Sequence, residues 1–498
     1  MSLIRKLASQ TAIYGLSSIV GRLINYLLVP LYVRTLSLYD NGVLTDFYAA
    51  VTFLLIIYTY GMETTFFRFA NKDELNEKDV YKTSLWCVII SSGLISFLLI
   101  IFSSPIATWM MYPAHPEYVI YFAIILGIDA VTSIPFVRLR QQHRPIKFVT
   151  GKLLNIGVNV LINLFFLVAC PWLLKNQPDS FLLKFYNPEI GVGYVFIANL
   201  IASIVTMLFL LPEFASSGGK FVKSVMEKML QYSFPLMFAG LAGMTNESFS
   251  RVILKYELPY SMTENIKQLG IFGQCFKLAI FMSLAIQTFR MASEPFFFST
   301  SKNLDAKLVY ARIMNYFVIV CCMIFLGVTL YLDILKHLLQ PAYFEGLVIV
   351  PILLLAYLFL GIFQNLTIWF KLGDKTSYGI YFAVFGAVIT IALNYALIPA
   401  YGYVGSAIAT LICYFLMAIS CYIVGQKYYE VPYNLKRISG YIILSIALYA
   451  TGNYIRLHIF HAGSIIWFLV MATLIGIFVC IAWIIERNDL KNVKSISN

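Results

Sequence analysis

Residues 347–370 read LVIVPILLLAYLFLGIFQNLTIWF, a stretch without a single charged side chain. About 20 consecutive apolar residues suffice for a helix to span the hydrocarbon core of a bilayer. Similar stretches recur along all 498 residues, of which 60% are hydrophobic and only 12% charged. Soluble proteins carry about 25% charged residues. The sequence therefore predicts an all-α integral membrane protein.

We expect about fourteen transmembrane helices. The predicted ranges are 8–33, 43–67, 83–104, 118–137, 149–170, 192–212, 229–250, 268–293, 313–332, 347–370, 377–398, 404–424, 438–455 and 463–485. The first range is too long for a signal peptide and no small-residue cleavage pattern follows it, so we expect it to be retained.

The formal net charge of +12 has an explanation that does not involve nucleic acid. Lys and Arg accumulate in cytoplasmic loops of membrane proteins. An even helix count places both termini on one side, and the loops on that side carry most of the basic residues, including Arg138, Arg140, Arg144 and Lys147 in one loop. We therefore expect both termini in the cytoplasm.

The eight cysteines show neither disulfide nor metal-ligand spacing.

A weak internal repeat appears at an offset of 231 residues. Glu63-Thr-Thr-Phe-Phe resembles Glu294-Pro-Phe-Phe-Phe, and Asn163 corresponds to Asn394. Two parallel halves related by an axis along the membrane normal occur in transporters. We predict an N-terminal lobe over 1–228, a C-terminal lobe over 229–437, each with six helices, and two accessory helices with a cytoplasmic tail over 438–498.

Ionisable side chains inside predicted helices mark the candidate site, because such groups are costly in a bilayer and usually face a cavity or a partner. Arg22 and Lys277 lie deep in their predicted helices, and each offers donors to an anionic group such as phosphate. The alternative is structural pairing with Asp129 or another carboxylate. Asp129 and Glu294 are themselves candidates for gating or ion coupling.

Other charged residues lie nearer the helix ends. Arg290 and Glu294 have the spacing of an intrahelical ion pair at a cytoplasmic end. Glu63 and Arg68 lie at the equivalent end of the first lobe, where they either gate the path or anchor the helix.

At the predicted outer end, Asp46, Glu247 and Arg251 are candidates for an external gate or for ion coupling, although an interfacial location explains them too. Asn155, Asn159 and a third asparagine recur every four residues along one helix face. Such a stripe favours helix association over sugar binding.

Enzyme signatures are absent from the sequence. It contains no G-x-x-x-x-G-K-S/T phosphate loop and no H-E-x-x-H pair. We therefore expect no enzymatic activity and no cofactor, with coupling to H⁺ or Na⁺ left open.

The sequence resembles the Wzx-type polysaccharide flippases of the multidrug/oligosaccharidyl-lipid/polysaccharide (MOP) exporter superfamily. The resemblance rests on 12–36 with its central Arg22, the turn Tyr39-Asp-Asn-Gly42, the segment Tyr60-Gly-Met-Glu63-Thr-Thr-Phe-Phe-Arg68-Phe, and Tyr401-Gly-Tyr-Val-Gly405 with the residues that follow.

The resemblance implies two six-helix lobes that alternate between inward-open and outward-open forms in the bacterial cytoplasmic (inner) membrane. It implies an undecaprenyl-pyrophosphate-linked oligosaccharide as substrate, for O-antigen (lipopolysaccharide) or capsule synthesis, and association with the polysaccharide polymerase machinery. Arg22, Lys277 and Arg290 match the cavity cations of the family. The alternatives are a cation-coupled exporter of small molecules or a lipid II flippase on the same fold.

Overall fold

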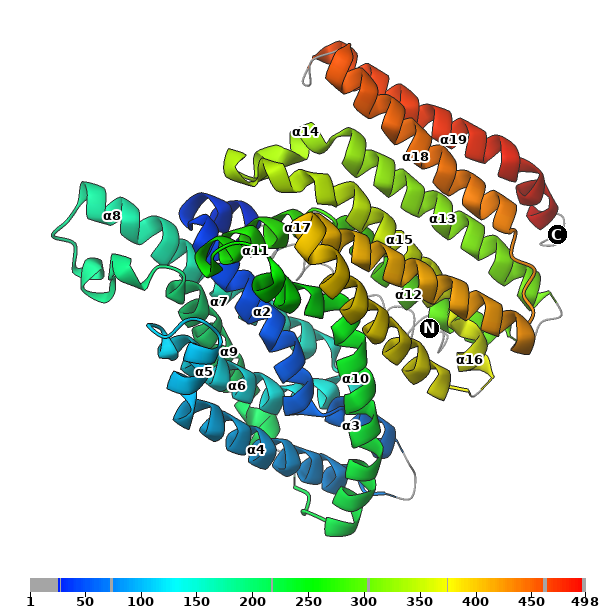
Figure 1. Cartoon of the computed structure of the whole chain (residues 1–498). Coiled ribbons are helices and arrows are strands. Elements are labelled where there is room, and N and C mark those ends of the chain that lie inside the picture. The colour runs from blue at the N-terminus through cyan, green and yellow to red at the C-terminus, as the bar shows by residue number, and fades with distance from the viewer. Residues whose placement is uncertain are drawn as a thin grey trace. The chain divides into compact units, whose positions relative to one another are not determined.

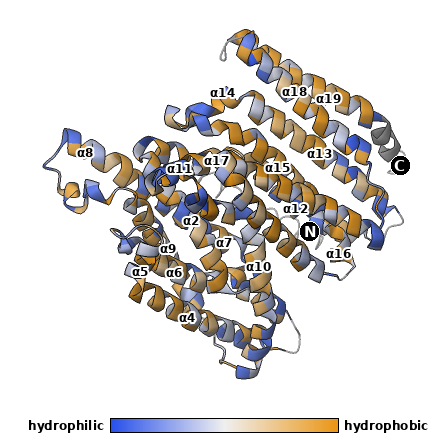
Figure 2. Ribbon diagram, viewed as in Figure 1, coloured by the Kyte–Doolittle hydropathy of each residue, from blue (hydrophilic) through white to orange (hydrophobic). Residues whose placement is uncertain are grey.

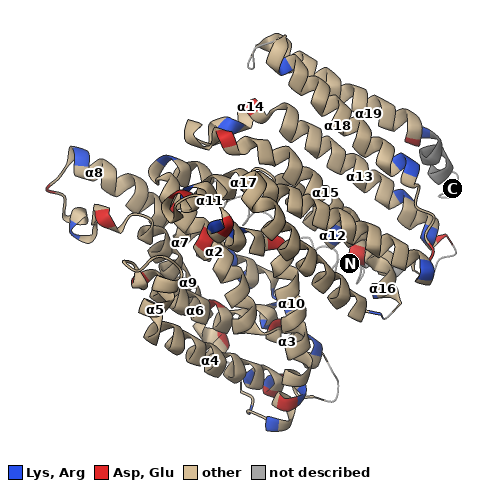
Figure 3. Cartoon of the chain, viewed as in Figure 1, with Lys and Arg blue, Asp and Glu red and all other residues tan. Residues whose placement is uncertain are grey.

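The computed structural model describes residue 26 and residues 28–71, 75–215, 218–301, 305–373, 375–459 and 464–494. Every regular element among these residues is helical (Figure 1), which confirms the predicted all-α class. Figure 2 shows helices that are mainly hydrophobic along their length, with hydrophilic residues at their ends and in the connections. Charged residues follow the same distribution (Figure 3), as expected for helices surrounded by lipid.

The helices group by their contacts into two compact units, Met1–Gly273 and Gln274–Asn498. The first unit contains α2 (Leu38–Thr59), α3 (Met62–Ala70), α4 (Glu77–Ile101), α5 (Ser103–Trp109), α6 (Pro116–Gln141), α7 (Pro145–Leu164), α8 (Cys170–Asn176), α9 (Gly193–Ala215), α10 (Lys223–Glu257) and most of α11 (Met262–Lys277). The second contains α12 (Ile280–Thr300), α13 (Ala306–Leu330), α14 (Leu332–Leu335), α15 (Ile349–Leu366), α16 (Ile368–Leu372), α17 (Ser377–Tyr428), α18 (Leu435–His458) and α19 (Ile465–Lys494).

The boundary between the two contact units lies later in the chain than the boundary between the two predicted lobes. The repeat predicted a boundary between 228 and 229, whereas α10 and most of α11 pack with the first unit. α10 packs along α2 and α3 through ring contacts, such as Phe53 with Phe249 and Tyr60 with Phe234. The division into two six-helix lobes therefore stays a prediction.

Among the described residues, 10 helices are long and apolar enough to cross a membrane, or up to 11 if the bent pair Met262–Lys277 and Ile280–Phe298 is counted as one span. Helices cover most of each predicted range from 43–67 to 463–485, although 43–67, 83–104, 268–293 and 347–370 are each divided between two or more helices. Most of 8–33 lies outside the described residues. α17 covers two predicted ranges and is kinked at Gly402, whose φ of 58° is left-handed. The chain is thus a multi-pass membrane protein, and the number fourteen stays a prediction.

The start and end of α2 differ from the prediction. Ser37 and Asp40 form a capping box that starts the helix at Leu38. The segment Tyr39–Gly42, expected as a turn, therefore lies within the first turns of α2. The helix ends where Tyr60 and Gly61 adopt left-handed conformations, with φ of 35° and 75°.

The two asparagines that define the repeat have matching environments. Asn163 donates from Nδ2 to the Asn159 carbonyl at 2.8 Å, and Asn394 donates to the Thr390 carbonyl at 2.7 Å. Both side chains are fully buried, and the Oδ1 atom of each has no hydrogen-bond partner in the described part of the chain. This match supports the internal repeat.

Candidate functional site

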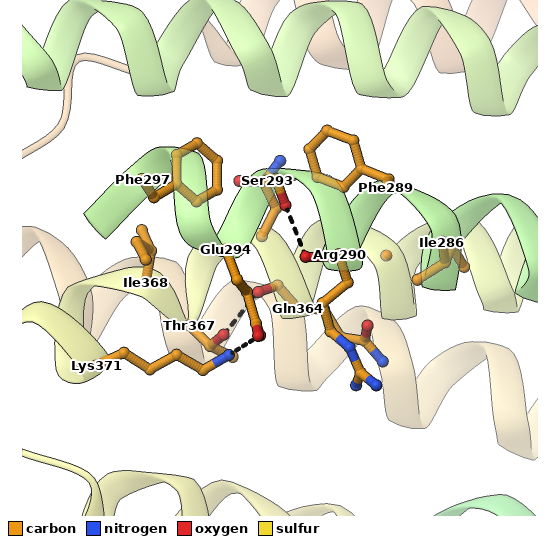
Figure 4. A pocket seen from close by; sticks show the side chains of 12 residues that line it. Ile286, Phe289, Arg290, Ser293, Glu294, Phe297, Gln364, Thr367, Ile368 and Lys371 are labelled. Carbon is orange, nitrogen blue, oxygen red and sulfur yellow. Dashed lines mark hydrogen bonds and ion pairs between the residues drawn. The ribbon is translucent and has the colours of Figure 1, made fainter. Parts of the chain in front are cut away.

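The second unit contains a small polar pocket between α12, α15 and α16 (Figure 4). Its lining consists of Ile286, Phe289, Arg290, Ser293, Glu294, Phe297, Gly361, Gln364, Asn365, Thr367, Ile368 and Lys371. The residues from α12 recur every three or four positions, so they share one face of that helix. Two sequence-predicted residues, Arg290 and Glu294, therefore belong to one site.

The acid in this pocket has a partner that the sequence spacing did not indicate. Glu294 Oε1 lies 2.6 Å from Lys371 Nζ of α16, and Figure 4 shows the two side chains pointing toward each other. The spacing had predicted a pair between Glu294 and Arg290. Arg290 instead is exposed and forms no ion pair with any described residue. With Glu294 neutralised by Lys371, Arg290 leaves the pocket with a net positive charge.

Two amide side chains in the pocket have polar atoms without a hydrogen-bond partner in the described part of the chain. Asn365 is only 4% exposed, and neither its Oδ1 nor its Nδ2 has a hydrogen-bond partner among the described residues. The same holds for Gln364 Oε1. A buried polar atom left unpaired costs about 1–3 kcal/mol. A ligand with hydroxyl or phosphate oxygens would provide partners for these groups.

The predicted outer end of the first unit contains a second charged cluster. Lys255 Nζ of α10 lies 2.5 Å from Asp46 Oδ2 of α2, and the two residues are 0% and 4% exposed. Lys255 also donates to the Met110 carbonyl at 2.6 Å. The Tyr112 hydroxyl donates to Asp46 Oδ2 at 2.9 Å. Burial and the neighbouring Asp46 carboxylate raise the pKa of Tyr112, so its hydroxyl remains a donor.

Sequence reasoning missed Lys255, because the predicted helix ended at residue 250. The signal was available in Pro259, since helices usually end at or before the residue that precedes a proline. α10 does continue to Glu257. Asp46 therefore pairs with Lys255, while Glu247, the other predicted gate residue, is exposed. Arg251 lies 3.5 Å from Ser248 Oγ.

The polar stripe on α7 connects that helix to α9. Asn155 donates to Thr206 at 3.0 Å, and Asn159 donates to Asn199 at 2.6 Å. These contacts join the two helices, as predicted for the stripe.

The remaining candidates are distributed over several helices. Asp129 accepts a hydrogen bond from Ser203 at 2.7 Å. Glu63 is exposed on α3, and the Arg68 guanidinium stacks 4.2 Å from the centre of the Tyr232 ring. Lys277 donates to Gln274 at 3.1 Å. Arg22 lies outside the described residues.

Comparison with known proteins identifies the family. The profile of the family described as polysaccharide biosynthesis protein matches residues 7–301, more than half of the chain. The chain belongs to this family. No curated protein sequence matches it significantly.

Solved structures define the fold of this polysaccharide biosynthesis family member. The lipid II flippase MurJ in an inward closed conformation is 13% identical with a TM-score of 0.72, and the match covers 96% of this chain and 99% of MurJ. An inward-facing MATE multidrug resistance transporter is 14% identical with a TM-score of 0.64, covering 84% and 95%. A MOP superfamily transporter from Pyrococcus furiosus is 14% identical with a TM-score of 0.56, covering 84% and 95%. The chain has the MOP transporter fold.

Proposed function

We propose that this protein translocates a lipid-linked oligosaccharide of the undecaprenyl-pyrophosphate type across the bacterial inner membrane, by alternating access, for surface polysaccharide synthesis. The family and the fold support transport in polysaccharide biosynthesis. The observation that carries the substrate class is the charge of the pocket in the second unit. Arg290 is free to bind an anion there, because Lys371 already neutralises Glu294.

The side chains of the pocket offer the chemistry that a pyrophosphate joined to a sugar requires, and its cavity of about 10 Å³ must widen to admit such a ligand. A guanidinium binds phosphate oxygens through directed, charge-assisted hydrogen bonds. Among the described residues, Asn365 Nδ2 and Oδ1 and Gln364 Oε1 have no hydrogen-bond partner, so the first can donate to a sugar hydroxyl and the two oxygens can accept from one. Phe289 and Phe297 also line the pocket, so it combines positive charge, amides and apolar surface.

A cation-coupled exporter of small molecules is the second candidate. Its support is three predicted acids that form no close ion pair with a described residue. Asp129 accepts from Ser203 and interacts electrostatically with Lys152, and Glu63 and Glu247 are exposed. Several other acids are already paired with basic residues, three of them in the regions discussed above. These are Asp46 with Lys255, Glu294 with Lys371, and Glu213 with Arg144 and Lys147.

The test is translocation of a fluorescent polyprenyl-pyrophosphate oligosaccharide in liposomes that contain the full-length protein, with and without a proton or sodium gradient. We expect translocation by the wild type and its loss in Arg290→Ala. Lys427→Ala is the matched control, because Lys427 is an exposed cation at the end of α17 outside the pocket. Efflux of a cationic dye without translocation of the lipid would favour the second candidate.

A further inference from the structure

Both charged groups of the buried pair Lys255 and Asp46 have further polar partners besides each other. Removing two charges from water costs several kcal/mol per ion, and good geometry with additional hydrogen bonds must repay that cost. Here the lysine contacts the Asp46 carboxylate and the Met110 carbonyl, and its Nζ lies 4.3 Å from the centre of the Tyr112 ring. The carboxylate also accepts the Tyr112 hydroxyl.

The cluster joins three segments that are distant in sequence. Asp46 lies in the third turn of α2, Lys255 in the last turn of α10, and Met110 and Tyr112 between α5 and α6. Asn265 fixes the end of α10, because its Nδ2 donates to the carbonyls of Lys255 and Leu258 at 3.1 and 3.0 Å. All three segments lie at the predicted outer end of the first unit.

The rest of the contact between α10 and the α2–α3 segment is made of weaker interactions. Phe53 packs edge-on against Phe249, with ring centres 5.8 Å apart, and Tyr60 stacks on Phe234 at 6.3 Å. Aromatic pairs contribute about 0.5–1.5 kcal/mol beyond their buried area. Removing one partner of the buried ion pair at one end of this contact costs about 3–5 kcal/mol, more than the loss of one such aromatic pair.

We propose that Asp46, Lys255 and Tyr112 form an outer latch that holds α10 against α2 while the transport path is closed to the outside, and that opens once in each cycle. The proposal rests on the proposed function, because alternating access requires such a contact to break. Both helices pack in the first contact unit, but the predicted repeat assigns α2 and α10 to different lobes. On that division, separation of this pair would open the outer side. Once opened, both charges are hydrated, which reduces the cost of breaking the pair.

The latch can be measured without any transport assay. Spin labels are placed at Thr35→Cys and Tyr260→Cys, two exposed positions next to α2 and α10, in full-length protein with Cys87 and Cys480 replaced by alanine. Pulsed electron paramagnetic resonance then gives the distance distribution between them in nanodiscs. We expect Lys255→Met to increase the ratio of long to short distances at least about tenfold.

Lys267→Met is the matched control, because Lys267 forms an exposed ion pair with Glu264 at 3.2 Å in the neighbouring helix. It should leave the distribution unchanged. Tyr112→Phe removes one hydrogen bond but keeps both charges, so it should shift the ratio in the same direction by a smaller factor, and it serves if Lys255→Met does not fold. If Lys255→Met folds and gives the wild-type distances, the latch is overturned. If Lys255→Met does not fold, wild-type distances in Tyr112→Phe overturn it. A shifted distribution in a protein that moves no lipid-linked saccharide would keep the latch and refute the proposed substrate.

Discussion

At the predicted outer end of the first unit, Lys255 and Asp46 satisfy each other in a closed cluster, whereas in the second unit Arg290 shares a pocket with a carboxylate that Lys371 already neutralises. The first cluster leaves no capacity for a ligand at its lysine. Among the described residues, the second has a cation without an ion pair and amide atoms without hydrogen-bond partners. The difference indicates that a charge within a membrane protein identifies a binding site only when its partner has been accounted for.

The largest effect should follow from breaking the closed cluster. Lys255→Met leaves the Asp46 carboxylate buried without its cation, which costs about 3–5 kcal/mol. The double variant Asp46→Leu with Lys255→Met removes both charges and should be much less destabilised than the single variant. Thermal unfolding in detergent compares the two. Equal loss of stability in both would show that the cluster is not governed by charge compensation.

The affinity of the pocket in the second unit for an anion should rise or fall with the charge of its side chains. Glu294→Gln frees Lys371 and should tighten binding of a soluble pyrophosphate compound a few-fold. Lys371→Met leaves Glu294 uncompensated and should weaken it by a similar factor, about 1 kcal/mol for a partly exposed pair. Equilibrium binding measures both. A change in the same direction for both variants would contradict a net positive pocket.

The repeat predicts matched, smaller effects in the two units. Asn163→Leu and Asn394→Leu each remove a hydrogen bond to the helix's own backbone, and each should cost about 1 kcal/mol or less. Unfolding midpoints of the two variants should agree closely. A large loss in only one of them would show that the two positions are not equivalent.

The smallest effect concerns Asp333 of the second unit, which lies outside the candidate spans and forms ion pairs with Lys336 and Arg456. Burial would raise the pKa of Asp333, but hydrogen bonds from Lys336 and Arg456 outweigh it and hold that pKa below its usual value. A carboxyl with a lowered pKa stabilises the fold above its unfolded pKa, and the contribution disappears as pH falls through the folded value. Asp333→Asn should therefore be less stable than wild type at pH 7, by under about 1 kcal/mol, and the difference should vanish in acid. A difference that persists in acid would contradict this assignment.

The helices were predictable from sequence because their signal is local. A run such as 347–370 must be helical in lipid, where backbone groups have no water partners, and α15 and α16 occupy that range. The break of α17 near Gly402 was also predicted, between the ranges that end at 398 and begin at 404.

The charge partners were not predictable in the same way. Arg290 and Glu294 are four residues apart, yet Glu294 pairs with Lys371, 77 positions along the chain. Lys255 and Asp46 are 209 positions apart. Helical spacing reports only neighbours on one helix, so pairs between helices require the tertiary arrangement.

Binding of a water-soluble, short-chain prenyl-pyrophosphate oligosaccharide to full-length protein tests the central claim most directly. The account predicts saturable binding by the wild type and by Lys427→Ala. It predicts a loss of about ten- to a hundredfold in Arg290→Ala, as expected for one hydrogen-bonded charge. Equal affinity in Arg290→Ala and in the wild type would contradict the assignment of the pocket in the second unit as the site for the anionic group.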